Sequence, residues 1–121
     1  MTQRILVVED TEDNRQIIRD LLTSAGYELI EAMDGLEGVA TAEREQPDLI
    51  LMDIQLPAID GYEATRRIRA IPALAKVPII AVTSYALSGD EAKTREAGCD
   101  GYVAKPFSPR QLLAKVREFL P

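Results

Sequence analysis

The sequence predicts an α/β fold, with helices on both faces of a five-stranded parallel sheet. Short apolar runs recur along the 121 residues, and a segment with apolar residues at helical spacing follows each of them. Connections of only a few residues join the two kinds of segment. This alternation is typical of parallel strands joined by right-handed helical crossovers, which form a three-layer, doubly wound structure. No repeat or linker interrupts it, so we expect a single domain over residues 1–121.

The first two strands and helices are predicted in the N-terminal third of the chain. Residues 4–8 form a short apolar run, as expected for a strand buried on both faces. Residues 11–25 have apolar side chains at helical spacing and stop before a glycine, a residue that often ends helices. Residues 27–32 alternate weakly and indicate the second strand, and residues 35–45 have one apolar side that indicates the second helix.

The third strand, at residues 48–53, has the clearest pattern, because four consecutive apolar residues end on the carboxylate of Asp53. Residues 62–71 form the next predicted helix, which a proline closes. The fourth strand is predicted at residues 77–82 and ends on Thr83.

The remaining elements are a helix, a short strand and a final helix. Ser88 can cap a helix at residues 89–97, and residues 102–104 indicate a short fifth strand. Ser108 as N-cap and Pro109 at the first helical position then open the last helix, which carries regularly spaced apolar residues.

Composition excludes several classes of function. The net charge of −6 argues against nucleic-acid binding through a broad basic surface. No apolar run approaches the length of a membrane span, about 20 residues, and no signal-peptide pattern opens the chain. The single cysteine, Cys99, excludes an internal disulfide and fits a reducing compartment, so we expect a cytoplasmic protein. Because the chain has no histidine, histidine-based catalysis and histidine-ligated metals are excluded.

Residues with chemical capacity end four of the five predicted strands. Glu9 and Asp10 follow the first strand, Asp53 ends the third, Thr83 follows the fourth and Lys105 follows the fifth. The carboxyl ends of parallel strands share one edge of the sheet, so we expect these side chains to lie close together. Clustered carboxylates repel one another unless a cation holds them, and hard oxygen ligands select Mg²⁺. The sequence therefore predicts an acidic Mg²⁺ site that handles phosphate, with an aspartate as nucleophile.

Taken singly, each of these residues also fits an ordinary structural role. Asp53 could simply end a strand, and Glu9 and Asp10 could form a solvated pair in a loop. Thr83 could be a strand-end β-former and Lys105 a surface lysine. The coincidence of four such strand ends in one chain favours a functional site.

One ordered set of motifs spans residues 4–120. It consists of Glu9-Asp10, Asp53 followed by Pro57 and Asp60-Gly61, Thr83-Ser84, Tyr102, and Lys105-Pro106. This set resembles the receiver domain of two-component response regulators, and the text around the third strand, with Gly89-Asp90-Glu91, looks most like the stand-alone DivK-type receivers. The resemblance implies the strand order 2-1-3-4-5.

The resemblance also implies a role for each acid. Asp53 is expected to accept a phosphoryl group from the phosphohistidine of a sensor histidine kinase or a histidine phosphotransfer protein. Asp10 and Asp53 are expected to bind Mg²⁺ directly, Glu9 through water and Gln55 through its backbone carbonyl. Mn²⁺ is expected to substitute for Mg²⁺. Glu9 occupies a position where the family often has Asp, a change that we expect to leave metal binding intact.

The same resemblance implies a switch. Thr83 is expected to bind the phosphoryl group and Lys105 to be its cationic partner, while Tyr102 is the switch aromatic. The peptide before Pro106 is expected to be cis. The protein is then a signalling module and not an enzyme, although it catalyses its own phosphorylation and dephosphorylation.

The chain ends directly after the last helix, so we expect no output domain. Output is expected through a downstream protein that docks on the face formed by the fourth helix, fifth strand and fifth helix. That face includes the apolar residues Ala86, Leu87, Ala104 and Phe107. No nucleic acid or membrane partner is expected, and the protein is expected to be a monomer or a weak dimer.

Three other classes share parts of this pattern. A phosphatase or phosphotransferase of the haloacid dehalogenase class also uses an aspartate nucleophile with Mg²⁺, but that class has Asp-x-Asp after the first strand. Here Asp53-Ile54-Gln55 lacks the second Asp and lies at the end of the third strand. A flavin-binding module of the flavodoxin class needs a Ser/Thr/Gly-rich phosphate loop, whereas the acidic residues 9–13 would repel a phosphate. A receiver-shaped protein that no longer takes phosphate would not need the intact site residues. Phosphate-ester turnover, flavin absorbance and BeF₃⁻ binding with Mg²⁺ distinguish these classes.

Overall fold

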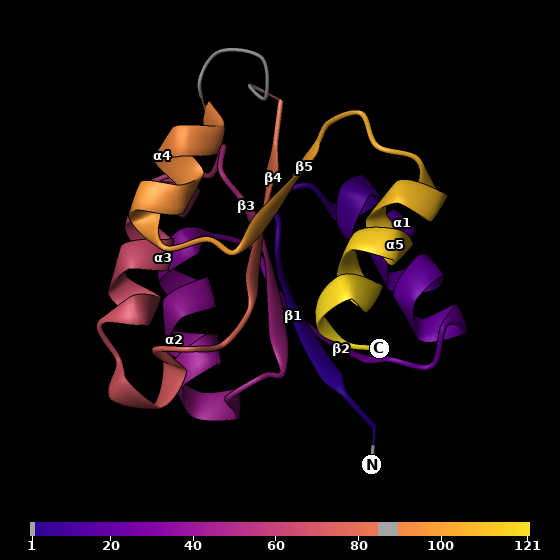
Figure 1. Cartoon of the computed structure of the whole chain (residues 1–121), viewed down its shortest axis with the longest axis horizontal. Helices are drawn as coiled ribbons and strands as arrows, with labels where there is room; N and C mark the ends of the chain where they lie inside the picture. Colours follow the sequence, from indigo (N-terminus) through magenta and orange to yellow (C-terminus); the bar gives the residue numbers. More distant parts are fainter. Residues whose placement is uncertain (1, 85–89) are drawn as a thin grey trace.

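The computed structural model describes residues 2–84 and 90–121 and has a three-layer α/β architecture (Figure 1). Its strands are β1 (Arg4–Val8), β2 (Glu28–Ala32), β3 (Leu49–Asp53), β4 (Ile79–Thr83) and β5 (Gly101–Ala104). Its helices are α1 (Glu12–Ser24), α2 (Gly35–Glu45), α3 (Gly61–Arg69), α4 (Asp90–Ala97) and α5 (Pro109–Phe119), with a short 3-10 helix η1 (Pro72–Leu74).

All strand pairs are parallel, and the strands lie in the order β2-β1-β3-β4-β5. The predicted doubly wound fold and its strand order are therefore confirmed. Helices α2, α3 and α4 cover one face of the sheet, and α1 and α5 cover the other (Figure 1). Since β1, β3 and β4 are the inner strands, they are buried almost throughout, as their unbroken apolar runs predict.

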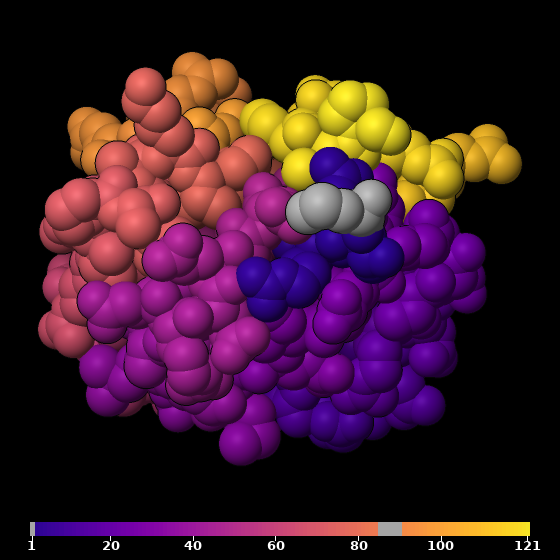
Figure 2. Space-filling view, turned by 90° about the horizontal axis from the view of Figure 1, so that it is seen from below, coloured from indigo at the N-terminus to yellow at the C-terminus, as the bar shows by residue number. Residues whose placement is uncertain are grey.

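Two apolar cores, one on each face, hold the layers together. Successive strand residues point to opposite faces, so Leu6 and Ile50 pack under α2 and α3, while Ile5 and Leu51 pack under α1 and α5. At the opposite end of the sheet from the strand carboxyl ends, Thr2 and Gln3 lie beside the end of α5, where indigo meets yellow in Figure 2.

Side-chain caps fix where three helices begin. Asp34 accepts a hydrogen bond from the Glu37 amide at 2.8 Å and starts α2. Asp60 does the same for α3, at 2.9 Å from the Glu63 amide. Ser108 forms a reciprocal capping box with Gln111 at the start of α5, so the predicted cap there is confirmed. The predicted cap Ser88 lies outside the described residues.

The pattern misplaced some element ends. β4 begins at Ile79 and not at residue 77, because Pro78 has no N–H to give to a strand ladder. The helix expected at residues 62–71 starts one residue earlier and ends at Arg69, and the unpredicted η1 follows it with Pro72 at its first position.

No helix among residues 2–84 and 90–121 combines the length and apolar character that crossing a membrane requires.

Candidate functional site

The carboxyl edge of the sheet brings the predicted site residues together. Glu9 and Asp10 follow β1, Asp53 is the last residue of β3, Thr83 is the last residue of β4 and Lys105 follows β5. Each strand is hydrogen-bonded to the next in the order 1-3-4-5, so these ends are neighbours in space. The sequence prediction of one shared edge therefore corresponds to the observed arrangement.

Three carboxylates form the acidic part of this edge. Glu9, Asp10 and Asp53 each offer one oxygen, and these oxygens lie within 4.8 Å of one another. Glu9 and Asp53 are only 3% exposed, whereas Asp10 is open to solvent. The pKa of Asp10 is raised, first because its partial burial removes some hydration and second because the Glu9 carboxylate lies beside it. A hard divalent cation would relieve this repulsion, and an all-oxygen donor set of this size fits Mg²⁺.

Lys105 bridges the two buried acids. Its ammonium donates to Glu9 Oε1 at 3.2 Å and to Asp53 Oδ2 at 3.1 Å. Burial lowers the pKa of Lys105, but the nearby Asp53 and Glu9 charges outweigh that effect, so its pKa is raised and the amine stays protonated. One ammonium against three carboxylates leaves an excess of negative charge, which a metal ion could balance.

Backbone amides orient both buried carboxylates. The Gln55 amide donates to Asp53 Oδ1 at 2.9 Å, and the Thr11 amide donates to Glu9 Oε2 at 3.0 Å. With Oδ2 held by Lys105, both oxygens of Asp53 have a fixed donor. The metal-ligand role of the Gln55 carbonyl stays a prediction.

A glycine allows α3 to begin directly against the end of β3. A Cβ at Gly61 would lie 2.3 Å from the Asp53 carbonyl oxygen and 2.7 Å from the Ile54 Cα. The Gly61 amide donates to the Ile54 carbonyl at 2.9 Å, which holds this approach in place. The Asp60-Gly61 part of the motif set thus has a physical reason: Asp60 caps the helix, and only glycine fits behind the site.

Thr83 and Tyr102 lie on the same face of the sheet. In the parallel register Tyr102 pairs with Ala81 and Thr83 pairs with Ala104, so alternation points both side chains toward the face covered by α3 and α4. Thr83 is fully buried, and Tyr102 is half-buried against the core on that face. The Lys105 amide donates to the Thr83 carbonyl at 2.8 Å, which joins the two strand ends.

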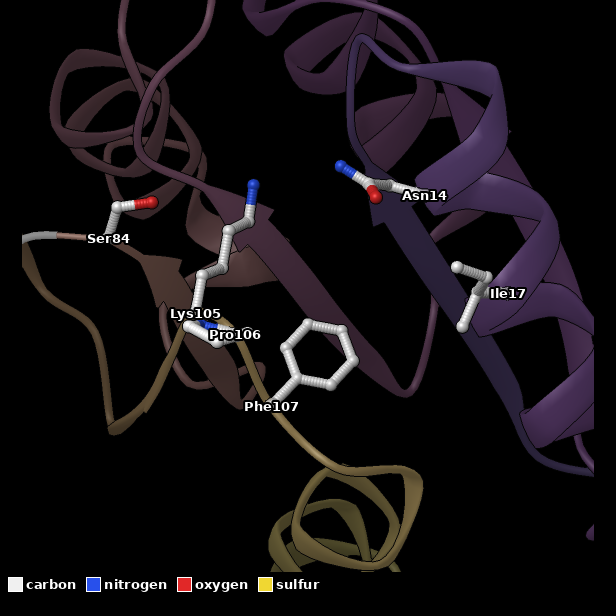
Figure 3. A pocket seen from close by; sticks show the side chains of 6 residues that line it. All are labelled: Asn14, Ile17, Ser84, Lys105, Pro106 and Phe107. Carbon is white, nitrogen blue, oxygen red and sulfur yellow. The ribbon is translucent and has the colours of Figure 1, made fainter.

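A cavity of about 570 Å³ opens beside this edge (Figure 3). Ile17, 53% exposed, and Phe107 supply its apolar walls, and Asn14 and Lys105 supply polar groups. The peptide between Lys105 and Pro106 is cis, the isomer that the sequence analysis expects.

Arg15, a buried cation on α1, is a further residue of the site that was not predicted from the sequence. Its guanidinium donates to the Glu9 carbonyl oxygen at 2.7 Å, directly behind the acid cluster. A signal was present, because Arg15, Ile18 and Leu22 are spaced by three and four residues and so share the buried face of α1.

Fold and site together define a class: doubly wound proteins with acids and a lysine at the carboxyl edge of the sheet. Residues 5–117 match the family model of the response regulator receiver domain. The chain therefore belongs to this family of signalling modules of two-component systems.

Curated relatives and solved structures agree with this membership. The polar-differentiation response regulator DivK of Brucella ovis is 42% identical over 120 residues, which are 99% of this chain and 98% of DivK. The receiver domain of the sensor histidine kinase PA1611 of Pseudomonas aeruginosa is 43% identical, with a TM-score of 0.92 and coverage of 99% and 98%. That structure has a magnesium ion coordinated in its active-site cleft.

A third structure, the chemotaxis response regulator CheY4 of Vibrio cholerae, is 28% identical with a TM-score of 0.94, covering 98% of this chain and 99% of CheY4. The chain is thus similar to response regulators and also to the receiver of a kinase. The expected absence of an output domain stays a prediction.

Proposed function

We propose that this receiver accepts a phosphoryl group on Asp53 while Mg²⁺ is bound among the neighbouring acids. The observation that carries the proposal is the bridge from Lys105 to both Glu9 and Asp53. It fixes a cation beside a nearly buried carboxylate that already has two oriented oxygens. Such an arrangement suits a nucleophile that must receive a highly charged group.

The transfer exchanges one bond to phosphorus for another. An Asp53 carboxylate oxygen attacks the phosphorus of a phosphohistidine, the P–O bond forms, and the P–N bond breaks. The electron pair returns to the donor's imidazole, which is then protonated. Because this chain has no histidine, the donor is a partner protein, a histidine kinase or a histidine phosphotransfer protein. We expect Lys105 and the Thr83 hydroxyl to bind the transferred oxygens.

The metal is expected to be held by Asp10, Asp53 and the Gln55 carbonyl directly and by Glu9 through water. When bound, Mg²⁺ supplies neutralisation of the charge on the phosphoryl oxygens. The three-carboxylate cluster supports this assignment, as does the magnesium reported in the cleft of the 43% identical receiver. We expect Mn²⁺ to substitute, because it accepts the same oxygen ligands.

The cavity beside the site supports donor docking there. Ile17 and Phe107 expose apolar surface next to Asn14 and Lys105, so a partner helix could pack there while its phosphohistidine approaches Asp53.

A second surface is proposed for output. A groove of about 490 Å³ lies along β5 and α5. Phosphate bound at Thr83 would draw that side chain toward Asp53, and the half-buried Tyr102 on the same face could then turn inward and reshape the groove. Ala86 and Leu87, which the sequence analysis assigns to this surface, lie outside the described residues. The proposed occupant of this groove is a downstream protein. We expect the receiver to be a monomer or weak dimer in the cytoplasm, without nucleic-acid or membrane partners.

Incubation with acetyl phosphate and Mg²⁺ tests the proposal. We expect one acid-labile phosphoryl group per chain by intact mass, none in Asp53→Asn, and normal incorporation in the control Asp34→Asn, which keeps its helix cap. Incorporation of one phosphoryl group per chain in Asp53→Asn would show that Asp53 is not the phosphoacceptor. Steady turnover of a generic phosphate ester would instead indicate a phosphatase.

A further inference from the structure

Arg15 lies buried between α1, β2 and the loop that carries the acid cluster. Its side chain is 8% exposed, and its guanidinium has three partners. One terminal nitrogen donates to the Glu9 carbonyl at 2.7 Å, the other to Glu12 Oε2 at 2.5 Å, and Nε lies 3.4 Å from Glu31 Oε1. The carboxylates of Glu12 and Glu31 therefore fix the orientation of the guanidinium, and its third nitrogen donates to the backbone of Glu9.

The backbone of Glu9 is fixed at both of its peptide groups. Arg15 binds the carbonyl of the peptide that follows Glu9, and β2 binds the N–H of the peptide that precedes it. The Glu9 amide donates to the Ala32 carbonyl at 3.1 Å, so β2 anchors the residue. Its carbonyl belongs to the planar peptide that ends at the Asp10 Cα. Fixing that carbonyl therefore fixes where the Asp10 side chain starts. Asp10 needs such support, because it is the exposed member of the three-carboxylate cluster.

We propose that Arg15 is a positioning residue, which holds Asp10 in the place required for binding the divalent cation. This inference rests on the proposed function, since it concerns the same Mg²⁺ site. Its predicted effect on Mg²⁺ affinity is opposite in sign to the effect expected from charge alone. Arg15 is positive and close to the cluster, so removing its charge would by itself favour Mg²⁺. If Arg15 positions the ligand, removing it weakens Mg²⁺ binding.

The matched control is Arg19, the neighbouring arginine of the same ion-pair cluster. Arg19 donates to Glu31 at 2.7 and 2.8 Å and to Glu12 at 3.3 Å. Arg15 differs from it by its bond to the Glu9 backbone. Arg19→Gln thus removes a charge and a set of ion pairs of the same kind without touching the loop that carries Asp10.

The experiment is a calorimetric Mg²⁺ titration of the full chain, well below the unfolding temperature of each variant. We expect Arg15→Gln to raise the Kd roughly tenfold, as loss of an outer support of a metal ligand often does. Arg19→Gln should leave the Kd unchanged or lower it. Arg15→Lys keeps the charge but has no planar fork, so its Kd should lie between those of wild type and Arg15→Gln.

Several results would overturn the inference. An unchanged or lower Kd in Arg15→Gln would leave Arg15 a structural ion pair. An equal rise in Arg19→Gln would do the same. If Arg15→Gln does not fold, Arg15→Lys decides, and a Kd equal to that of wild type overturns the proposal. Failure of wild-type protein to bind Mg²⁺ would contradict the proposed function itself, so the two failures are distinguishable.

Discussion

Replacing Lys105 by methionine removes the cation from the centre of the site while keeping much of the side-chain stem. Glu9 and Asp53, each 3% exposed, are then left facing one another without their shared donor. Removing one partner of a fully buried ion pair costs roughly 3–5 kcal/mol. The Lys105 side chain is 20% exposed, so water can partly replace it, and a loss of about 2–3 kcal/mol is expected.

For a domain of this length, about 2–3 kcal/mol corresponds to a fall in Tm of roughly 10 °C. The assay is thermal and urea unfolding in EDTA, with Lys115→Met as the control. Lys115 pairs with Glu118 at 3.2 Å on the surface, where an ion pair contributes about 0.5 kcal/mol or less. The double variant Lys105→Met/Glu9→Gln should recover much of the loss, because it removes one of the two facing charges.

Added Mg²⁺ should stabilise Lys105→Met more than it stabilises wild type, since the metal then replaces the missing positive charge. A free energy of unfolding for Lys105→Met within about 0.5 kcal/mol of wild type, the level of a surface pair, would contradict this role of Lys105. Equal stabilisation of the two proteins by Mg²⁺ would contradict it as well.

Four further outcomes are expected. The pKa of Lys105 is raised in the folded state, so its contribution to the free energy of unfolding is fully present below its unfolded pKa. Urea titrations should show this contribution constant from neutral pH to about 10 and lost above about pH 10. Gly61→Ala should cost about 3 kcal/mol in urea unfolding, because its Cβ meets backbone at 2.3 Å; a loss below about 1 kcal/mol would contradict this. Mg²⁺ at ten times its Kd should add about 1.4 kcal/mol to wild type by thermal unfolding and little to Asp10→Ala. Thr83→Ala should still take phosphate on Asp53 but show no BeF₃⁻-dependent partner binding; full binding would exclude Thr83 from the switch.

Most of the fold was predictable because burial leaves a direct trace in the sequence. The inner strands β1 and β3 are apolar on both faces and were recognised as such, and α2 was predicted with its observed bounds. The order of strands was not available from periodicity, since an alternating pattern is compatible with several orders of parallel strands. It came from the resemblance of the motif set.

What could not be predicted depends on contacts distant in sequence or on backbone geometry. Ala58 has a φ of 69° in the loop before α3, a left-handed conformation that the presence of an alanine does not predict. Gly61 lies against the end of β3 at a distance that only the packed structure reveals. Arg15 occupies the buried face of α1 because Glu12, Glu31 and the Glu9 carbonyl are there to receive it.

The charges at the carboxyl edge explain why the site is built with an internal cation. Three carboxylates within 4.8 Å oppose folding in the absence of metal, yet the proposed chemistry needs all of them at once. Lys105 offsets part of this repulsion permanently, and its two bonds reach the buried acids while Asp10 stays open to solvent. The remaining negative charge is therefore concentrated where an arriving cation can reach it. A stronger internal neutralisation would stabilise the metal-free fold but weaken its affinity for the ion, so the partial balance suits a site that must stay ready to bind.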